Sequence, residues 1–465
     1  MHWLVTLVAL AIAVPAYGQH QQHTFAVHPN TNLHGRFLHI TDIHLDPHYQ
    51  NGATIKSGCH DQPKKHRKKK QRKGKLAGYW GAPTTDCDSS EPWVYHAIKT
   101  IADDWKDKID FIVWTGDNAR HDLDKKIPRT KQEILELNHK ITTSLQEAFR
   151  DENNKTIPIV PCIGNNDVHP HNQLRSTASS TLDAYSKLWS NMIPRDQQDV
   201  FRQGGYFAVN VLPGIRVLSL NTLYFFESND QVLACKDPKS AGNRHLDWIR
   251  EELTRARNMQ ARVYMIGHVP PSARTFYSSC LAAYTQLSIE FRDVIAAHLY
   301  GHVNYDHFIV VQQEQQSQEK NKVISIEKDS GRYITNLKHQ YQQVNANDQD
   351  KAVVVHVAPP ILPIYYPGYR INEYHNDSRS AHFGTWTRYH QYYCNLTYWN
   401  NEKQHHALPR FELEYSTDET YGMQNLTVGS WLDLAHRMTR KTKESRALWN
   451  TYVDNIFVQT EHDDD

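Results

Sequence analysis

Long apolar runs are scarce in this 465-residue chain, and the longest of them, Trp3–Val14, has 12 residues. A transmembrane helix needs about 20 apolar residues, so no other segment is expected to span a bilayer. The run suits the core of a signal peptide, although it lacks a basic segment before it, and Ala16-Tyr17-Gly18 offers small residues for cleavage. We expect residues 1–18 to be a cleaved signal peptide or an uncleaved signal anchor, with the remainder of the chain in the secretory pathway.

An excess of charge of one sign is also lacking, because the formal net charge is +1, and we expect no nucleic-acid partner. The chain nevertheless contains 29 histidines. An exposed histidine has a pKa of about 6.5, so the protein would become strongly cationic in a compartment near pH 5.

Cysteines are few, and the six that are present fit an oxidising compartment. We expect Cys59 to pair with Cys87 and Cys235 with Cys280, although six cysteines leave other pairings open. Cys162 lies in an apolar segment and is predicted to be a buried thiol. Glycosylation would accompany secretion, and it is predicted at four sequons, which begin at Asn154, Asn376, Asn395 and Asn425.

Composition divides the chain into segments of different character. Residues 19–35 are polar and are predicted to be a flexible lead-in to a domain over 36–363. Within that domain, 64–75 consists mostly of lysine and arginine and is expected to be an exposed loop. Residues 312–351 are rich in Gln, Lys, Asn and Asp, and we expect a disordered or cleavable insertion there. The segment 364–465 is predicted to be an extension, with aromatic residues packing over the sheet and a helical tail.

Apolar strand-like segments alternate with segments of helical periodicity, which predicts an α/β domain. Strands are expected at 37–40, 110–115, 157–163, 215–220, 262–266, 298–300 and 351–362. Helices are expected at 92–106, 130–149, 243–259 and 284–297. In such domains, active sites form where loops leave the ends of the strands.

Potential metal ligands follow five of these strands directly. The first pair, Asp42 and His44, are two residues apart, so their side chains leave an extended backbone on the same side. A carboxylate and an imidazole offered together are half of a divalent-metal site. The segments are Asp42-x-His44, Gly116-Asp117-x-x-x-His121, Gly164-Asn165-Asn166-Asp167, Gly267-His268 and Gly301-His302-Val303-Asn304. Each alone has an ordinary structural explanation, but the five in this order do not.

In order and residue type, the five segments resemble the calcineurin-like metallophosphoesterase superfamily, in its acid-sphingomyelinase-like branch. The resemblance covers about residues 36–310 and the strand at 353–363. It implies a two-sheet sandwich flanked by helices (αββα) that holds two divalent ions. Such a pair activates a water and holds the attacking and leaving oxygens of an in-line displacement at phosphorus.

The resemblance also implies roles for individual residues. Asp117 would bridge the two ions and be catalytic, and His121 would occupy the place of a proton-donating histidine. The first ion would be held by Asp42, His44, Asp117 and Asn304, and the second by Asp117, Asn165, His268 and His302. Where the family commonly has histidine, this chain has Asn166 and Asn304. An amide oxygen is a harder ligand than imidazole, so we expect Mn²⁺, Co²⁺ or Mg²⁺ to be tolerated as well as Zn²⁺.

Within the superfamily, the longer motif segments resemble fungal vacuolar endopolyphosphatases, which share both asparagine replacements. This resemblance implies hydrolysis of phosphoanhydride bonds within inorganic polyphosphate, in the vacuole lumen or at the vacuole membrane facing the lumen. A phosphate leaving group has a pKa of only about 6 and needs little protonation, so the asparagine at 166 would cost less here than in a phosphodiesterase.

Contacts to substrate are predicted for three residues near the motifs and for the basic loop, namely Arg120, His121, Asn166, Lys68, Lys69 and Lys70. One alternative function is an acid-sphingomyelinase-like phosphodiesterase acting on a lipid or nucleotide ester, although no apolar docking module precedes residue 36. The other is an inactive protein that binds metal and polyanions.

Deletion of residues 64–75 should raise the KM for long polyphosphate and flatten its dependence on salt. The loop carries a cluster of positive charge, and electrostatic steering of a polyanion is screened by ions. Initial rates measured against ionic strength check this, and an unchanged salt slope would contradict the steering role.

Overall fold

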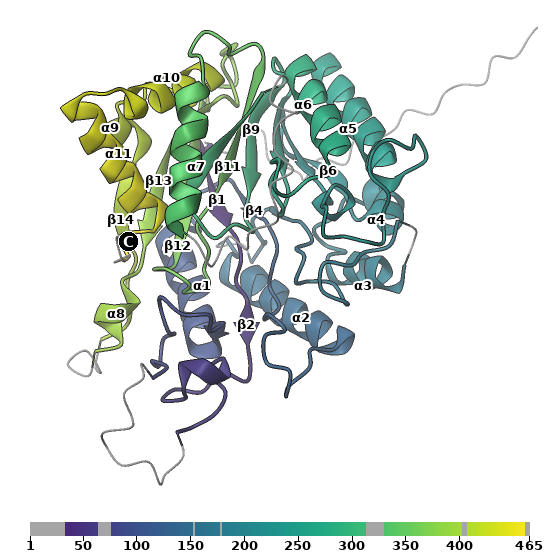
Figure 1. Ribbon diagram of the computed structural model, residues 1–465. Helices are drawn as coiled ribbons and strands as arrows, with labels where there is room; N and C mark the ends of the chain where they lie inside the picture. The colour runs from purple at the N-terminus through teal and green to yellow at the C-terminus, as the bar shows by residue number, and fades with distance from the viewer. Residues whose placement is uncertain are drawn as a thin grey trace, which may run out of the picture.

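The computed structural model describes residues 33–63, 76–151, 154–176, 179–312, 330–401 and 407–460. Two six-stranded sheets form its centre (Figure 1). The first has the strand order β14 (Glu412–Ser416), β13 (Trp386–Tyr393), β12 (Gly368–Tyr374), β1 (Arg36–Ile40), β4 (Phe111–Trp114) and β5 (Ile159–Pro161). The second has the order β10 (His307–Gln312), β11 (Ala352–Val357), β9 (Ile295–Tyr300), β8 (Arg262–Ile266), β7 (Ile215–Ser219) and β6 (Phe207–Leu212).

The inner parts of both sheets are parallel. In the first, β1 pairs with β4 and β4 with β5, and in the second β7, β8 and β9 run in the same direction. Their strands read as continuous apolar runs because both faces are buried. The sheets face each other through aromatic side chains, with the Phe37 ring 5.0 Å from that of Tyr264. Parallel strands bring their carboxyl ends to one edge, which is where the predicted ligands follow.

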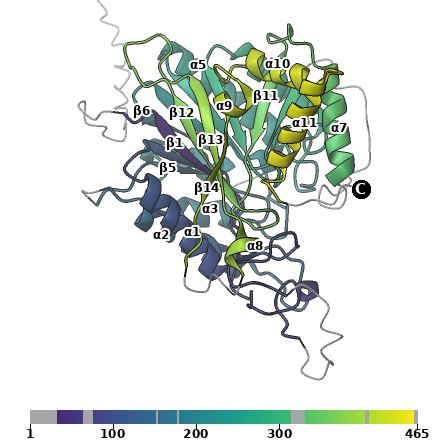
Figure 2. The same cartoon turned by 90° about the vertical axis from the view of Figure 1, so that its left-hand side faces the viewer.

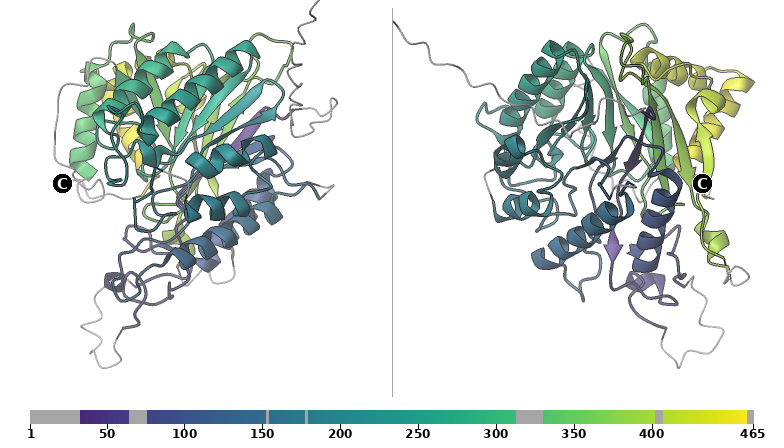
Figure 3. Two further views of the ribbon diagram at one scale, coloured as in Figure 1. Left: turned by 90° about the vertical axis from the view of Figure 1, so that its right-hand side faces the viewer. Right: turned by 180° about the vertical axis from the view of Figure 1, so that it is seen from behind.

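Helices surround the sandwich (Figures 1 and 3). Those of the first half are α1 (Glu91–Trp105), α2 (Lys131–Ala148), α3 (Ser180–Leu188), α4 (Gln198–Gly204), α5 (Ala241–Asn258) and α6 (Ser278–Glu290). Those of the second half are α7 (Ser330–Gln343), α8 (Leu396–Trp399), α9 (Thr417–Tyr421), α10 (Val428–Thr439) and α11 (Lys443–Ile456). Helices α5 and α6 lie at one side, and α7, α10 and α11 at the other. The predicted sandwich flanked by helices is therefore confirmed.

The C-terminal segment is part of the sheet, which the sequence did not predict. Strand β12 pairs antiparallel with β1, and β13 and β14 continue the sheet outward. Figure 2 shows α9, α10 and α11 beside these strands and β11. Tyrosine and tryptophan are typical of strands, and Tyr369, Trp386 and Tyr389 of this segment lie within the sheet. Among the described residues, no helix combines the length and apolar character needed to span a bilayer.

The predicted insertion at 312–351 is wrong for the part that the structure describes. Residues 330–343 form α7, whose Tyr333, Leu337 and Tyr341 are buried at helical spacing. The Tyr341 hydroxyl donates to the Phe308 carbonyl oxygen at 2.6 Å, which attaches the helix to β10. Three apolar residues among many polar ones were enough to form a packed helix face. Residues 313–329 lie outside the described part of the chain.

The predicted helix at 284–297 is wrong at its end, because α6 ends at Glu290 and Ile295 begins β9. The pairing of β9 with β8 on one side and β11 on the other outweighs the helix propensity of its two alanines. The lead-in over residues 19–32, the signal segment and the basic loop 64–75 lie outside the described residues.

The disulfides are those predicted, Cys59–Cys87 and Cys235–Cys280, and Cys162 is a buried free thiol. A buried ion pair joins the two sheets. Arg370 on β12 donates to Asp306, which precedes β10, and the Tyr415 hydroxyl donates to the other oxygen of that carboxylate at 2.6 Å. Both charged side chains are almost fully buried.

Asp306→Ala should therefore lower the free energy of unfolding by about 3–5 kcal/mol, because it leaves the Arg370 cation buried without its partner. Urea denaturation of the purified protein measures this. Asp199→Ala, which removes an exposed partner of Arg202, is the matched control and should change stability by less than about 1 kcal/mol. Equal effects of the two variants would contradict the role assigned to the buried pair.

Candidate metal centre

The predicted ligands converge at the carboxyl edge of the parallel strands, between the two sheets. Asp42 and His44 follow β1, Asp117 follows β4, and Asn165 follows β5. His268 follows β8, and His302 and Asn304 follow β9. Two groups share a carboxylate: Asp42, His44 and Asp117 form one, and Asp117, His268 and His302 the other. Within each group the potential ligand atoms lie within 4.8 Å of one another.

The backbone at these positions is in the left-handed region. The φ angles are 48° at Asp42, 46° at His44, 58° at Asp117, 73° at His302 and 62° at Asn304. Residues other than glycine rarely adopt this region, and instances gather at functional sites. The left-handed residues turn the chain sharply after each strand and keep the side chains at its end.

Two glycines allow the loops to approach each other. A Cβ atom added at Gly164 would lie 2.0 Å from Oδ1 of Asp117, and one added at Gly301 would lie 2.3 Å from Oδ2 of Asp42. Any larger residue would displace these carboxylates. Gly164 and Gly301 are therefore required because a side chain at either position would overlap a carboxylate of the site.

Asp117 lies at the centre of the group. Its Oδ2 is 3.1 Å from Nε2 of His268 and 3.5 Å from Nε2 of His44. Nε2 of His44 is 3.7 Å from Oδ1 of Asp42, and Oδ1 of Asn165 is 2.8 Å from Nε2 of His268. A carboxylate with imidazoles on both sides is placed to be shared by two cations.

The surroundings fit divalent cations. Nδ1 of His44 and Nδ1 of His268 bond to the backbone carbonyls of Ala119 and Thr115, at 3.1 and 2.8 Å, which leaves Nε2 of each ring for a metal. Oδ1 of Asn304 is buried and has no hydrogen-bond partner among the described residues. A buried carbonyl oxygen without a donor is accounted for if a cation occupies the site.

The electrostatics of the site depend on the Asp117–His268 pair. Burial favours a raised pKa for Asp117, but the His268 and His44 imidazoles hold it well below its usual range. Burial also opposes a charge on His268, but the Asp117 carboxylate outweighs it and raises the pKa of His268 to about 9. Without metal, a proton on His268 therefore balances part of the negative charge.

Asp167, for which the sequence suggested no role, holds the two central loops together. Its carboxylate accepts from the backbone N–H groups of Asp117 at 2.8 Å, Asn118 at 2.8 Å, Ala119 at 3.2 Å and Gly164 at 3.0 Å. This bonding orients the loop that carries Asp117. Asp167 ends the Gly-Asn-Asn-Asp segment, but nothing in the sequence separates a ligand there from a residue that supports the ligands.

His121 lies beside the centre, with its ring stacked on His44 at 4.1 Å between centroids. Asp88 holds it, because the Asp88 carboxylate accepts from Nδ1 at 2.6 Å and from the backbone N–H at 2.8 Å. Asp88 was not predicted from the sequence, because it follows no strand-end motif. It is adjacent to Cys87, so the Cys59–Cys87 disulfide anchors it.

The residues predicted to contact substrate differ in their hydrogen-bond partners. Arg120 is 1% exposed and its guanidinium is occupied by Glu133 at 2.7 and 3.1 Å, so the geometry does not support a phosphate contact. Asn166 donates to Oδ2 of Asp117 at 2.8 Å. Lys68, Lys69 and Lys70 lie outside the described residues.

Of the sequon asparagines, Asn154, Asn376 and Asn425 are exposed and Asn395 is half-buried, and their glycosylation stays a prediction.

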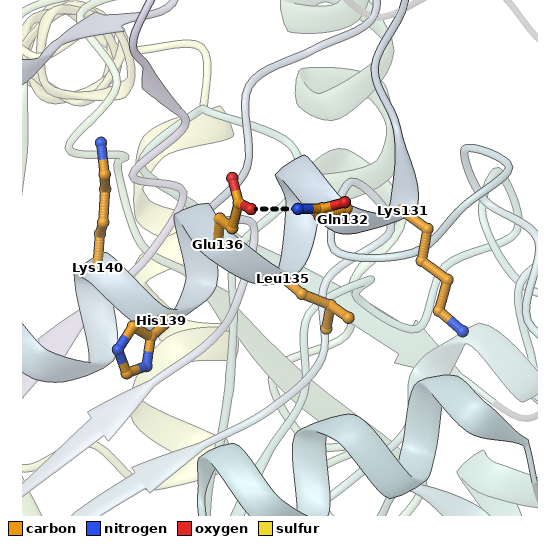
Figure 4. A pocket seen from close by; sticks show the side chains of 6 residues that line it. All are labelled: Lys131, Gln132, Leu135, Glu136, His139 and Lys140. Carbon is orange, nitrogen blue, oxygen red and sulfur yellow. Dashed lines mark hydrogen bonds between the residues drawn. The ribbon is translucent and has the colours of Figure 1, made fainter.

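One surface hollow of the described residues is unrelated to this centre. Figure 4 shows it along the outer face of α2, lined by Lys131, Gln132, Leu135, Glu136, His139 and Lys140. Most of its polar groups have partners: Lys131 donates to Ser180 at 2.6 Å, Lys140 to Glu91 at 2.7 Å, and Gln132 to Glu136 at 2.8 Å. It is a solvated helix face.

The fold and the donor set together are those of a metal-binding α/β sandwich. The sequence profile of the family described as calcineurin-like phosphoesterase matches residues 35–305, more than half of the chain. The chain therefore belongs to the calcineurin-like phosphoesterase family, which confirms the superfamily predicted from the motifs. The match and the donor set support the binding of divalent metal.

Curated relatives named endopolyphosphatase occur in several fungi. That of Cryptococcus neoformans is 34% identical over 422 residues, which cover 79% of this chain and 62% of the relative. That of Debaryomyces hansenii is 40% identical over 285 residues, covering 60% and 38%. That of Saccharomyces cerevisiae is 28% identical over 592 aligned positions, covering 93% and 86%. The chain thus spans less than two thirds of the first two relatives.

A dimetal phosphatase from Danio rerio is a structural neighbour, with a TM-score of 0.42 and 9% identity. The alignment covers 77% of this chain and 96% of the neighbour. This similarity is too low to support a conclusion about the site.

Metal binding to the stripped protein should release about one proton at pH 7, because His268 must lose its proton to become a ligand. The raised pKa, about 9, means that the proton is present at pH 7. The apparent affinity should therefore increase about tenfold per pH unit below pH 9. Calorimetric titration with Mn²⁺ in buffers of different ionisation enthalpy measures the release, and an enthalpy independent of buffer would contradict the assignment.

Proposed function

We propose that this protein hydrolyses phosphoanhydride bonds within long chains of inorganic polyphosphate, with two divalent ions held by its strand-end residues. The observation that carries the proposal is the position of Asp117, shared by two groups of potential ligands. The names of the fungal relatives support the substrate. The reaction would make the protein a hydrolase acting on acid anhydrides.

The residues divide between the two ions as the family pattern implies. Asp42, His44 and Asn304 would hold one, Asn165, His268 and His302 the other, and Asp117 both. When bound, two such ions supply an activated water and charge stabilisation for an in-line displacement at phosphorus. Thr41 supports this set, because its hydroxyl donates to Oδ2 of Asp42 at 2.6 Å and fixes that carboxylate.

His121 would act on the leaving side of the reaction. Asp88 accepts from Nδ1, which directs Nε2 of the ring away from Asp88 and fixes the tautomer. With Nδ1 bonded to Asp88, Nε2 carries a proton only when the ring is doubly protonated, and in that form it would donate a hydrogen bond or a proton to the departing phosphate oxygen. Because that oxygen belongs to a group whose pKa is about 6, a hydrogen bond suffices for much of the stabilisation.

Placement in the secretory pathway is part of the proposal, with the vacuole lumen as the expected destination. Two disulfides support an oxidising compartment. The three exposed sequon asparagines are accessible to glycosylation.

A time course on long-chain polyphosphate, resolved on a gel, tests the function. Fragments of intermediate length should form early with the metal-loaded protein, and Asp117→Asn should reduce their formation at least about 100-fold, because it removes the shared charge. Asp199→Ala, a surface variant, is the control and should cleave at the normal rate. A sphingomyelin assay runs in parallel, and intact polyphosphate with release of choline phosphate would replace this proposal with the lipid phosphodiesterase.

A further inference from the structure

A buried arginine beside the metal centre has donors that no residue uses. Arg129 precedes α2, and its side chain is 5% exposed. Its Nη1 donates to the backbone oxygens of Arg120 at 2.6 Å and Asn166 at 2.8 Å, and lies 3.2 Å from Oδ1 of Asn166. Its Nε and Nη2 are shielded from water and have no hydrogen-bond partner in the part of the chain that the structure describes.

The two unused donors belong to one edge of the guanidinium. Nε–H and Nη2–H point in nearly parallel directions, and this edge matches two oxygens of a carboxylate or phosphate. Asp122, Asp117, Asp167 and Asp88 all act on Arg129 through their charge. Among the described residues, however, none of them forms an ion pair with it at 4.0 Å or less.

Leaving this edge unpaired is costly. A buried cation without a partner and a buried donor without an acceptor each destabilise the folded protein. The nearby Arg120 shows the alternative, because its corresponding edge is filled by Glu133 at 2.7 and 3.1 Å. Among the described residues, Arg120 therefore has a carboxylate acceptor for this edge, whereas Arg129 has none.

Arg129 is connected to the Asp117 carboxylate through one intervening side chain, that of Asn166. Arg129 lies 3.2 Å from Oδ1 of Asn166, and Nδ2 of Asn166 donates to Oδ2 of Asp117 at 2.8 Å. Asn166 stands where the family commonly has a histidine, so its amide cannot supply positive charge. Arg129, whose Nη1 lies beside that amide oxygen, carries a permanent positive charge.

We propose that the Nε–Nη2 edge of Arg129 binds two oxygens of a phosphoryl group of the substrate chain, next to the bond that is cut. This assignment rests on the proposed function. Because both nitrogens are shielded from water, binding of the phosphoryl group requires a neighbouring side chain to move aside. Orthophosphate, the simplest form of the same group, is the probe.

Arg129→Lys tests the assignment, because lysine keeps the charge and one donor but lacks the paired edge. Loss of that edge should weaken orthophosphate binding to the metal-loaded full chain about tenfold, measured by calorimetry. The KM for long-chain polyphosphate should increase by a similar factor, while metal content and melting temperature change little. Arg216→Lys is the matched control, since Arg216 is a buried arginine paired with Glu252 at the far end of β7, and it should leave both values unchanged.

Unchanged orthophosphate affinity in Arg129→Lys would overturn the proposal. Weaker orthophosphate binding with an unchanged KM for polyphosphate would also overturn it, because Arg129 would then bind free phosphate only. Loss of metal together with affinity would show that Arg129 only holds the two loops, and would also overturn it. The calorimetric measurement does not require hydrolysis. If the wild-type protein leaves polyphosphate intact, the proposed function is contradicted, and calorimetry still tests whether Arg129 binds phosphate.

A second measurement needs no variant. A crystal structure of the wild-type protein with metal and orthophosphate should place Nε and Nη2 of Arg129 within hydrogen-bond distance of two phosphate oxygens. Phosphate bound at the centre with that edge still unpaired would overturn the assignment even if Arg129→Lys does not fold.

Discussion

The sharp turns at the carboxyl ends of β1, β4 and β9 determine whether this site exists. Asp42, Asp117 and His302 each have a left-handed backbone at such an end, a conformation that costs about 1–3 kcal/mol per residue. The surrounding structure offsets this cost, because Asp167 accepts four backbone N–H groups from the two central loops. Without those bonds the loops would relax and the ligands would separate.

A second constraint is the burial of so many charges in one place. Asp42, Asp117 and Asp167 are each almost completely buried. Such carboxylates persist only where hydrogen bonds or positive charge compensate for the lost hydration. Backbone N–H groups compensate Asp167, whereas Asp42 and Asp117 face imidazoles and, in the proposed function, two cations. Asp167 thus supports the loops through hydrogen bonds, whereas Asp42 and Asp117 are potential metal ligands.

The residues that the sequence predicted to come together do so where the pattern is local. Asp42, His44 and Asp117 follow apolar strands directly, and the order of the five segments indicated the family and hence the two sheets. The pattern did not predict Asp88 or Arg129, because neither follows a strand and each reaches the site only through a loop whose path depends on tertiary packing. Arg120 was misjudged for the related reason that its partner, Glu133, lies 13 residues away on α2.

The fold was predicted least well where local propensity and tertiary pairing disagree. The alanines before His298 favour a helix, but the gap between β8 and β11 makes them a strand. Helix α7 was not predicted because its sequence is mostly polar, although three of its residues are buried on one face. The strands β12 to β14 were not foreseen as part of the first sheet, because sequence pattern alone does not show which edge a distant segment joins.

The central claim is that Asp117 is shared by two cations, and anomalous diffraction from crystals loaded with Mn²⁺ tests it most directly. The account predicts two anomalous peaks, one beside Asp42 and His44 and the other beside His268 and His302, with the Asp117 carboxylate in contact with both. A single peak, or two peaks of which only one touches Asp117, would contradict it.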